Sequence, residues 1–267
     1  MLKDITLGQY FPGTTPIHKL DPRVKITATL LYIIVIFIAK SYISYALVIA
    51  FLLGCIFTSK IPLKVILKGI KPILWIIAIT AILNLFYTDG EPLVQWKIFK
   101  ISAEGIRSAI MMSLRIIMLI MGTFLLTYTT SPIMLTDAME EMLGPLKKIK
   151  IPVHELAMMM SIALRFIPTL IEETDKIISA QKARGADFES GKLISRAKAL
   201  IPILVPLFIS AFRRADELAV AMECRCYNGG EGRSKMRRLK MRGSDFTGLI
   251  ISVVFFVVVC LLRKVGP

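Results

Sequence analysis

The sequence predicts an all-α polytopic membrane protein with about five transmembrane helices and three further helices that lie in the cytoplasm or at the membrane interface. Two observations lead to this fold class. Of the 267 residues, 55% are hydrophobic and the mean hydropathy is +0.67, whereas an ordinary soluble domain is roughly 45–50% apolar. Long apolar runs also alternate with dense basic stretches, which is typical of a multi-pass membrane protein. A disordered chain is excluded by the apolar content, and a disulfide scaffold by the presence of only four cysteines.

Five apolar runs can cross a bilayer, since a spanning helix needs about 20 residues within a range of about 17–25. The first two runs are short and are joined only at Lys40, so they form a tight hairpin or lie partly in the membrane interface. The connection between the third and fourth runs is expected to be a loop. The predicted spans are Val24–Ala39, Ser41–Thr58, Ile70–Tyr87, Gly105–Tyr128 and Phe246–Leu262.

The positive charges predict the orientation. The net charge is +15, and the charges flank apolar runs, which favours a positive-inside topology over binding of nucleic acid. The first loop carries Lys40 alone, whereas the second carries Lys60, Lys64 and Lys68, and residues 129–245 carry 19 Lys and Arg. Basic loops are cytoplasmic, so the N-terminus and residues 129–245 are expected in the cytoplasm and the C-terminal tail outside.

Arg115 lies in the middle of the fourth predicted span. An arginine within the membrane is costly and normally faces a protein interior or reaches the interface. It could belong to a substrate path or a partner contact, or it could hold helices together by pairing with a carbonyl or carboxylate. The second interpretation is favoured.

Residues 129–245 are expected to form three helices. The first begins at Ser131-Pro132, an N-cap followed by a proline at the first helical position, and Gly144-Pro145 ends it. The second runs from Pro152 to about Arg184, contains Pro168 and is ended by Gly185. The third runs from about Lys192 to Arg225, contains Pro202 and Pro206 and is ended by Asn228-Gly229-Gly230.

The apolar parts of the second and third helices, Leu156–Ile171 and Ala199–Phe212, could also be short membrane spans. Two extra spans would leave the orientation unchanged, so the charges do not decide. Arg165 and three prolines interrupt these stretches, which favours long helices that lie along or under the membrane and pack against each other.

These two helices also resemble a repeat offset by 41 residues, in which Arg184 at one helix end corresponds to Arg225 at the other. In both copies an aspartate, Asp175 or Asp216, stands nine residues before the arginine. A cation is favourable at any helix C-terminus, so both arginines can be ordinary capping charges. Alternatively, each presents a planar donor group to a carboxylate or carbonyl of a partner.

The sequence also resembles the transmembrane coupling (T) component of energy-coupling-factor transporters, which is of EcfT or CbiQ type. Three stretches, which together extend over most of the chain, are similar to the family pattern. The first is Gly8-Gln9-Tyr10-Phe11-Pro12-Gly13 followed by Pro16-Ile17-His18-Lys19-Leu20-Asp21-Pro22-Arg23. The others are Leu164-Arg165-Phe166-Ile167-Pro168-Thr169-Leu170 with Glu172, and Ala183-Arg184-Gly185 with Ala186-Asp187.

The resemblance implies a scaffold and coupling subunit that is not itself an enzyme and needs no cofactor. It implies two ATP-binding-cassette ATPase subunits, one at each Ala-Arg-Gly-type helix end. It also implies a separate substrate-binding membrane protein (the S component) that holds a vitamin or transition-metal ion in the cell membrane. The ATPase-binding residues would be Ala183, Arg184, Gly185, Cys224, Arg225 and Cys226. The hinge or coupling-helix residues would be Arg165, Pro168, Pro202 and Pro206.

This interpretation divides the chain into three regions. Residues 1–128 would form an N-terminal membrane region with about four spans, 129–245 the cytoplasmic coupling-helix region, and 246–267 the final transmembrane helix and a short tail. The chain contains no G-x-x-x-x-G-K-[ST] motif, which agrees with ATPases that are separate chains. The alternative function is a self-sufficient channel or secondary transporter, but such a protein would have inward polar residues in several spans, and here Arg115 is nearly alone.

The second signature departs from the family pattern. The run is Ala221-Met222-Glu223-Cys224-Arg225-Cys226-Tyr227, where the family has Ala and Gly on either side of the arginine. If the glycine ends the helix in the left-handed region, Cys226 must be strained or another residue, such as Gly229 or Gly230, must take its place. Two thiols are only half of a usual zinc ligand set, so no metal is expected at Cys224 and Cys226.

Overall fold

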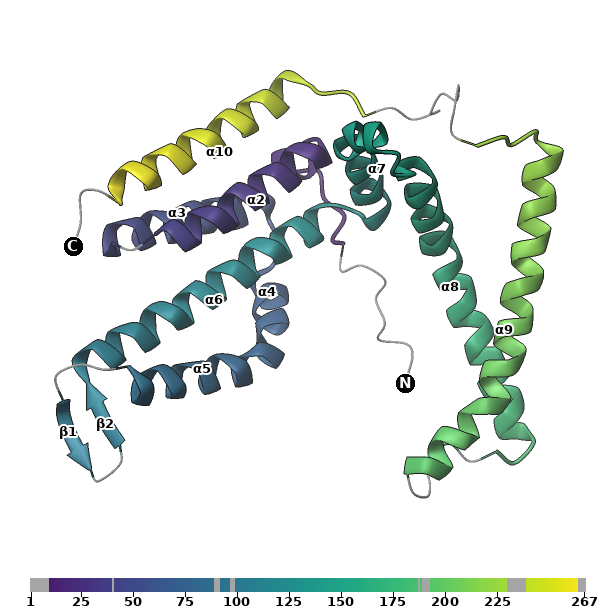
Figure 1. The fold of residues 1–267 in the computed structure, drawn as a ribbon, viewed down its shortest axis with the longest axis horizontal. Coiled ribbons are helices and arrows are strands. Elements are labelled where there is room, and N and C mark those ends of the chain that lie inside the picture. Colours follow the sequence, from purple (N-terminus) through teal and green to yellow (C-terminus); the bar gives the residue numbers. More distant parts are fainter. Residues whose placement is uncertain are drawn as a thin grey trace. The chain divides into compact units, whose positions relative to one another are not determined.

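A computed structural model of the chain describes residues 10–39, 41–88, 92–96, 99–186, 188, 193–229 and 239–263. These residues form ten α-helices, two 3₁₀ helices and one two-stranded sheet, so the predicted all-α class is confirmed (Figure 1). In chain order the elements are α1 (Pro16–Lys19), α2 (Pro22–Ile38), α3 (Tyr42–Ser59), α4 (Leu63–Ile70), η1 (Lys71–Ile73), α5 (Leu74–Tyr87), β1 (Pro92–Trp96), β2 (Phe99–Ser102), α6 (Ala103–Thr129), α7 (Pro132–Met142), η2 (Gly144–Ile149), α8 (Val153–Ala183), α9 (Leu193–Cys224) and α10 (Gly243–Leu262).

The described residues separate into two compact units. One unit comprises residues up to Leu135 together with those from Leu239 onward, and the other comprises the residues from Thr136 to the end of the described segment at 229. The chain therefore leaves the first unit after α6, at the beginning of α7, and returns to it just before α10. We call these the bundle unit and the arm unit.

In the bundle unit, α2 packs against α10 and α6, and α5 packs against α6. The core is apolar and includes Val35, Ile36 and Val48, none of which is exposed. Tyr32 of α2 lies directly over Gly122 of α6, where an added Cβ would come within 2.2 Å of the ring. The Tyr32 hydroxyl donates to the Met118 carbonyl at 3.1 Å. A glycine at this position therefore lets α2 and α6 approach each other closely.

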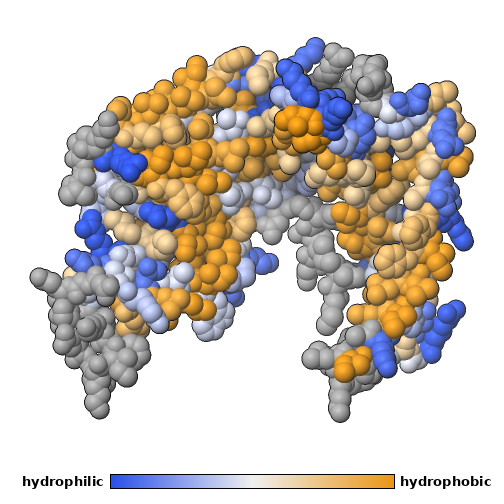
Figure 2. All heavy atoms as spheres, in the orientation of Figure 1, coloured by the Kyte–Doolittle hydropathy of each residue, from blue (hydrophilic) through white to orange (hydrophobic). Residues whose placement is uncertain are grey.

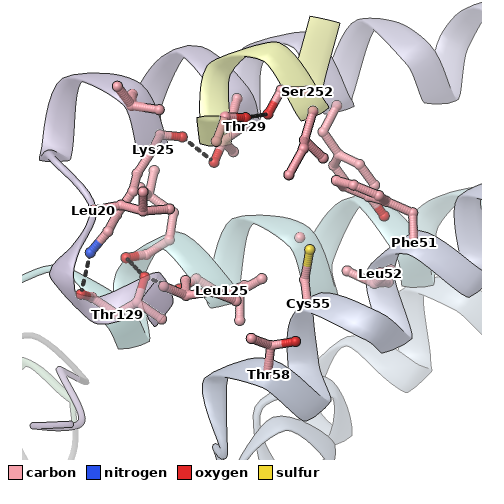
Figure 3. A pocket seen from close by; sticks show the side chains of 18 of the residues that line it. Leu20, Lys25, Thr29, Phe51, Leu52, Cys55, Thr58, Leu125, Thr129 and Ser252 are labelled. Carbon is pink, nitrogen blue, oxygen red and sulfur yellow. Dashed lines mark hydrogen bonds between the residues drawn. The ribbon is translucent and has the colours of Figure 1, made fainter. Parts of the chain in front are cut away.

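An open apolar cavity of about 410 Å³ lies inside the bundle unit. Residues of α2, α3, α6 and α10 line it, and Phe51, Cys55 and Leu125 are among them (Figure 3). Lys25 lies at its edge with its amine directed toward Thr129.

Five helices in the described part of the chain are long and apolar enough to cross a membrane: Tyr42–Ser59, Leu63–Tyr87, Ala103–Thr129, Val153–Ala183 and Gly243–Leu262. Four of them overlap predicted spans. The first predicted span corresponds to α2, which has only 17 residues and so reaches the lower end of the spanning range. Helix α8 meets the same criteria, so its expected position along or under the membrane stays a prediction.

Two expectations for the loops were wrong. Lys64 and Lys68 belong to helix α4, which precedes the η1 turn and α5, because the run Leu63–Ile70 places its apolar residues at helical spacing around these lysines. The connection between the third and fourth spans forms an antiparallel hairpin of β1 and β2 in which Trp96 pairs with Phe99.

Arg115 joins two helices of the bundle unit. Its Nε and Nη2 donate to the hydroxyl of Tyr45 on α3 at 3.1 and 2.8 Å. The helix-packing interpretation of this arginine is therefore supported, with a hydroxyl as the acceptor in place of the expected carbonyl or carboxylate.

The arm unit consists of the rest of α7, η2, α8 and α9. As predicted, α7 begins at Pro132 after Ser131, whose hydroxyl accepts from the Met134 amide, and Gly144-Pro145 follows its end. Helices α8 and α9 have 31 and 32 residues, and both continue through their internal prolines. His154 of α8 contacts Glu140 of α7 at 2.9 Å between Nδ1 and Oε1, which joins α7 to the first turn of α8.

Candidate functional site

The two long helices of the arm unit end with the same hydrogen-bond pattern. At the end of α8, the Gly185 amide donates to the Lys182 carbonyl and the Ala186 amide donates to the Gln181 carbonyl, both at 3.0 Å. Gly185 has φ +85°. This is a Schellman motif, in which a residue in the left-handed region ends the helix and satisfies its last carbonyls. Arg184 is the capping residue immediately before that glycine.

At the end of α9, each of these interactions recurs 41 residues later. The Cys226 amide donates to the Glu223 carbonyl at 2.8 Å, and the Tyr227 amide donates to the Met222 carbonyl at 3.0 Å. Cys226 itself has φ +55°. The helix ends near Arg225, as predicted, but Asn228-Gly229-Gly230 does not end it. Of the two predicted alternatives, the structure has the strained one, because Cys226 takes the left-handed conformation that the glycine takes in α8. A non-glycine residue in this conformation costs roughly 1–2 kcal/mol.

Both helix ends, which we call the tips, present their signature residues to solvent. Arg184 and Arg225 are exposed and lie one residue before the left-handed residue of their motif. The flanking Ala183, Gly185, Cys224 and Cys226 are exposed as well. A guanidinium held at a rigid helix end can make two parallel hydrogen bonds with a carboxylate, and it can also donate to a carbonyl. The structure thus gives both arginines one local geometry, as the repeat predicted.

A polar contact joins α8 to α9 between the tips. Glu173 accepts from Arg214 Nη2 at 2.9 Å and also from the Ser210 hydroxyl. Farther along α8, the Gln181 side chain donates to the Pro202 carbonyl at 3.4 Å. Partners on α9 thus have lower numbers as one moves forward along α8, so the two helices run antiparallel and their tips lie at opposite ends of the pair (Figure 1).

This contact was missed by sequence reasoning, although a signal was present. Glu173 and Arg214 are 41 residues apart, so they occupy the same position of the repeat and carry opposite charges. In two antiparallel helices related by a repeat, equivalent positions near the crossing face each other. An acid paired with a base at that offset could have indicated the crossing.

The predicted hinge residues are all in helix interiors. Pro168 lies within α8, and Pro202 and Pro206 lie within α9. Arg165 and Pro168 are exposed, as is Pro202. The structure therefore places these residues on the helices that carry the tips, and their role in coupling stays a prediction.

The two cysteines beside Arg225 are free thiols. Among the described residues, no group of three or more His, Cys, Asp or Glu side chains is arranged to hold a metal ion.

Known proteins are similar in sequence to this chain over nearly its full length. A family model described as cobalt transport protein (CbiQ) matches residues 13–236. The chain belongs to the CbiQ family. The energy-coupling factor transporter transmembrane protein EcfT of Clostridium kluyveri is 57% identical, with 98% of this chain and 96% of that protein aligned. The EcfT proteins of Ruminiclostridium cellulolyticum and Bacillus subtilis are 54% and 50% identical, covering 99% and 95% of this chain and 99% and 96% of their own lengths.

As a CbiQ-family protein of this kind, the chain is the multi-pass transmembrane subunit of an energy-coupling factor transporter in the cell membrane. It is a non-catalytic subunit that works within a transporter complex. The resemblance drawn from the N-terminal motif, the proline-containing helix and the Ala-Arg-Gly signature is therefore confirmed.

Proposed function

We propose that this subunit links ATP hydrolysis by two separate ATP-binding-cassette subunits to uptake of a vitamin or transition-metal ion held by a separate S component. The observation that carries this proposal is the pair of tips. Two helix ends with one hydrogen-bond pattern and one exposed arginine each suit two similar partners, and Arg184 and Arg225 would each bind one ATPase subunit.

The apolar surface of the arm unit supports a membrane partner. Much of α9 before its charged half is exposed and apolar (Figure 2). A large exposed apolar surface marks a protein or membrane contact. Because the S component is itself a membrane protein, this surface suits it and the surrounding lipid. The exposed residues of this part of α9 are Leu200, Ile201, Leu204, Val205, Phe208, Ile209 and Phe212.

The proposed orientation follows the charges. Lys147, Lys148 and Lys150 lie at η2 beside α8. Lys60 is the C-cap of α3, and Lys64 and Lys68 lie on α4, at the beginning of the candidate span Leu63–Tyr87. Positive residues favour the cytoplasmic side, so the N-terminus and the arm unit would face the cytoplasm and the tail after α10 would face outward. This orientation would be tested by introducing single cysteines at positions expected on one or the other side of the membrane and labelling them in intact cells.

Copurification tests the role of the tips. Arg184→Ala with Arg225→Ala should abolish recovery of the ATPase subunits, since truncation of one partner of a buried charged pair at an interface costs roughly 2–5 kcal/mol. The matched control is Lys176→Ala with Arg213→Ala, which removes two exposed positive charges from the same helices away from the tips. Both proteins should insert into the membrane to equal levels. Stoichiometric ATPase binding by the tip variant would refute the proposal.

A further inference from the structure

The N-terminal motif contacts both connections between the bundle unit and the arm unit. The outgoing connection begins after Thr129, the last residue of α6, and leaves the bundle unit after Leu135. The chain re-enters that unit at Leu239, shortly before α10. The segment from Phe11 to Lys25, which includes the family-type run Pro16–Arg23, belongs to the bundle unit and reaches each of these places. The role proposed for the tips does not explain why this segment contacts both connections.

Two contacts hold the outgoing connection. The Phe11 amide donates to the Tyr128 carbonyl at 2.9 Å. Lys25 Nζ donates to the Thr129 carbonyl at 2.9 Å (Figure 3) and to the His18 carbonyl at 3.0 Å. The Tyr128 and Thr129 carbonyls are the last two of α6. Such carbonyls have no partner within the helix and are favourable sites for a cation.

Other residues of the same segment hold the returning connection. The Asp21 amide donates to Asp245 Oδ1 at 2.7 Å, and Asp245 Oδ2 accepts from the Arg242 amide at 2.6 Å. Arg23 Nη2 reaches the Leu239 carbonyl at 3.4 Å. Asp245 therefore ties the beginning of α10 to the beginning of α2, and Arg23 contacts the first residue after the chain returns.

The charges in this cluster balance, and three of them are deeply buried. Asp21, Lys25 and Asp245 are 6%, 7% and 2% exposed. Arg23 binds the Asp21 carboxylate with two hydrogen bonds of 3.0 and 2.9 Å. Burial alone would raise the pKa of Asp21, but the hydrogen bonds and charge of Arg23 outweigh it and hold that pKa below its usual value. Buried charges are retained only when they are paired in this way.

We propose that Asp21, Arg23, Lys25 and Asp245 form an anchor that fixes both chain connections to the bundle unit, and that these four positioning residues are required to convert movement of the arm unit into transport. The proposal rests on the function proposed above. When the ATPases move the arm unit, this movement reaches the bundle unit only if the two connecting segments keep their positions on the bundle unit. Charge-assisted hydrogen bonds are stronger than neutral ones. A buried cluster of them can therefore hold both segments at once.

The variants Lys25→Met and Asp245→Asn test the anchor with little change in side-chain volume. We expect the subunit to assemble with its partners and ATP hydrolysis to continue. Uptake per ATP hydrolysed should fall about tenfold, because a hydrogen bond to a charged group contributes about that factor to an equilibrium. The control is Arg115→Met, which also removes a partly buried cation from the bundle unit, but at a contact with Tyr45 away from both connections.

Hydrogen exchange of the purified subunit gives a readout that does not depend on ATPases. Lys25→Met should speed amide exchange over residues 130–135, Asp245→Asn should speed it over 239–242, and Arg115→Met should do neither. An equal fall in the uptake-to-hydrolysis ratio for all three variants would show a merely structural role and overturn the proposal. So would unchanged exchange at the connections, or faster exchange with a wild-type ratio. Failure of the proposed function would appear separately, as ATPase binding that survives loss of Arg184 and Arg225.

Discussion

Glu173 on α8 and Arg214 on α9 occupy equivalent positions of the 41-residue repeat and bind each other, with Oε2 and Nη2 2.9 Å apart. The pair lies where the antiparallel helices cross. Its side chains are partly exposed, 23% for Glu173 and 34% for Arg214, and Ser210 adds a second donor to the carboxylate. The contact therefore fixes the register of α8 against α9.

Loss of the Glu173 carboxylate should loosen this crossing. We expect Glu173→Ala and Arg214→Ala each to lower the free energy of unfolding by about 1 kcal/mol, a modest value because solvent screens partly exposed pairs. The double variant should cost less than the sum of the two, as expected for residues in contact. Thermal unfolding in detergent would measure the cycle, with Glu172→Gln, a neighbouring exposed acid, as the control. Strict additivity would show that the pair contributes nothing to the crossing.

Cys226 should be less favourable than glycine at the end of α9. Because its φ is +55°, Cys226→Gly should raise stability by about 1 kcal/mol through relief of the left-handed strain. Gly185→Ala at the equivalent position of α8 should lower stability by a similar amount. Unfolding measurements on both variants would check the opposite signs.

The pair Cys224→Ala and Cys226→Gly should also keep transport and assembly intact, because we expect both cysteines to be structural neighbours of Arg225. Elemental analysis of the wild-type subunit tests the same point. Tightly bound zinc, or a loss of assembly in the double variant, would contradict this interpretation.

Pro168 should shape α8 for coupling. An interior proline removes one backbone hydrogen bond and bends the helix axis, and it is about 3 kcal/mol less favourable than alanine. Pro168→Ala should therefore stabilise α8 yet misplace Arg184 relative to Arg225. We expect an assembled complex whose ATP hydrolysis is poorly linked to uptake, measured as both rates in liposomes with all partners present. Pro152→Ala, at the N-cap of the same helix, is the control. A wild-type ratio for Pro168→Ala would mean that the bend has no part in coupling.

Local chemistry in the sequence predicted much of the arm unit. Ser131-Pro132, Gly144-Pro145 and Gly185 mark helix ends by their own backbone preferences, and the structure has ends at those places. The end of α9 near Arg225 was also predicted, but glycine preference pointed to Asn228-Gly229-Gly230 as the stop, whereas the Schellman hydrogen bonds of the α9 end are formed at Cys226. At this helix end the hydrogen bonds of the Schellman motif outweigh the preference of cysteine against the left-handed region.

Contacts between distant segments could not be predicted in this way. Asp21 and Asp245 are 224 residues apart, and two acids give no sequence signal for a hydrogen bond that runs from the backbone of one to the side chain of the other. The β1–β2 hairpin was missed because Leu93–Ser102 was treated as a charged connection between spans. The tips were predicted as residues, but their shared hydrogen-bond pattern required the structure.

The crossing at Glu173 and Arg214 has a mechanical consequence. Each of these residues stands eleven positions before the arginine of its own tip, which at 1.5 Å per residue is about 16 Å along each helix. If the helices pivoted at that crossing, Arg184 and Arg225 would lie at equal distances from the pivot. A movement of one tip would therefore produce a movement of equal size at the other. In the proposed assembly, two identical ATPases or two different ones would receive the same leverage, so any asymmetry in the transport stroke must originate in the ATPases or in the cargo-binding partner.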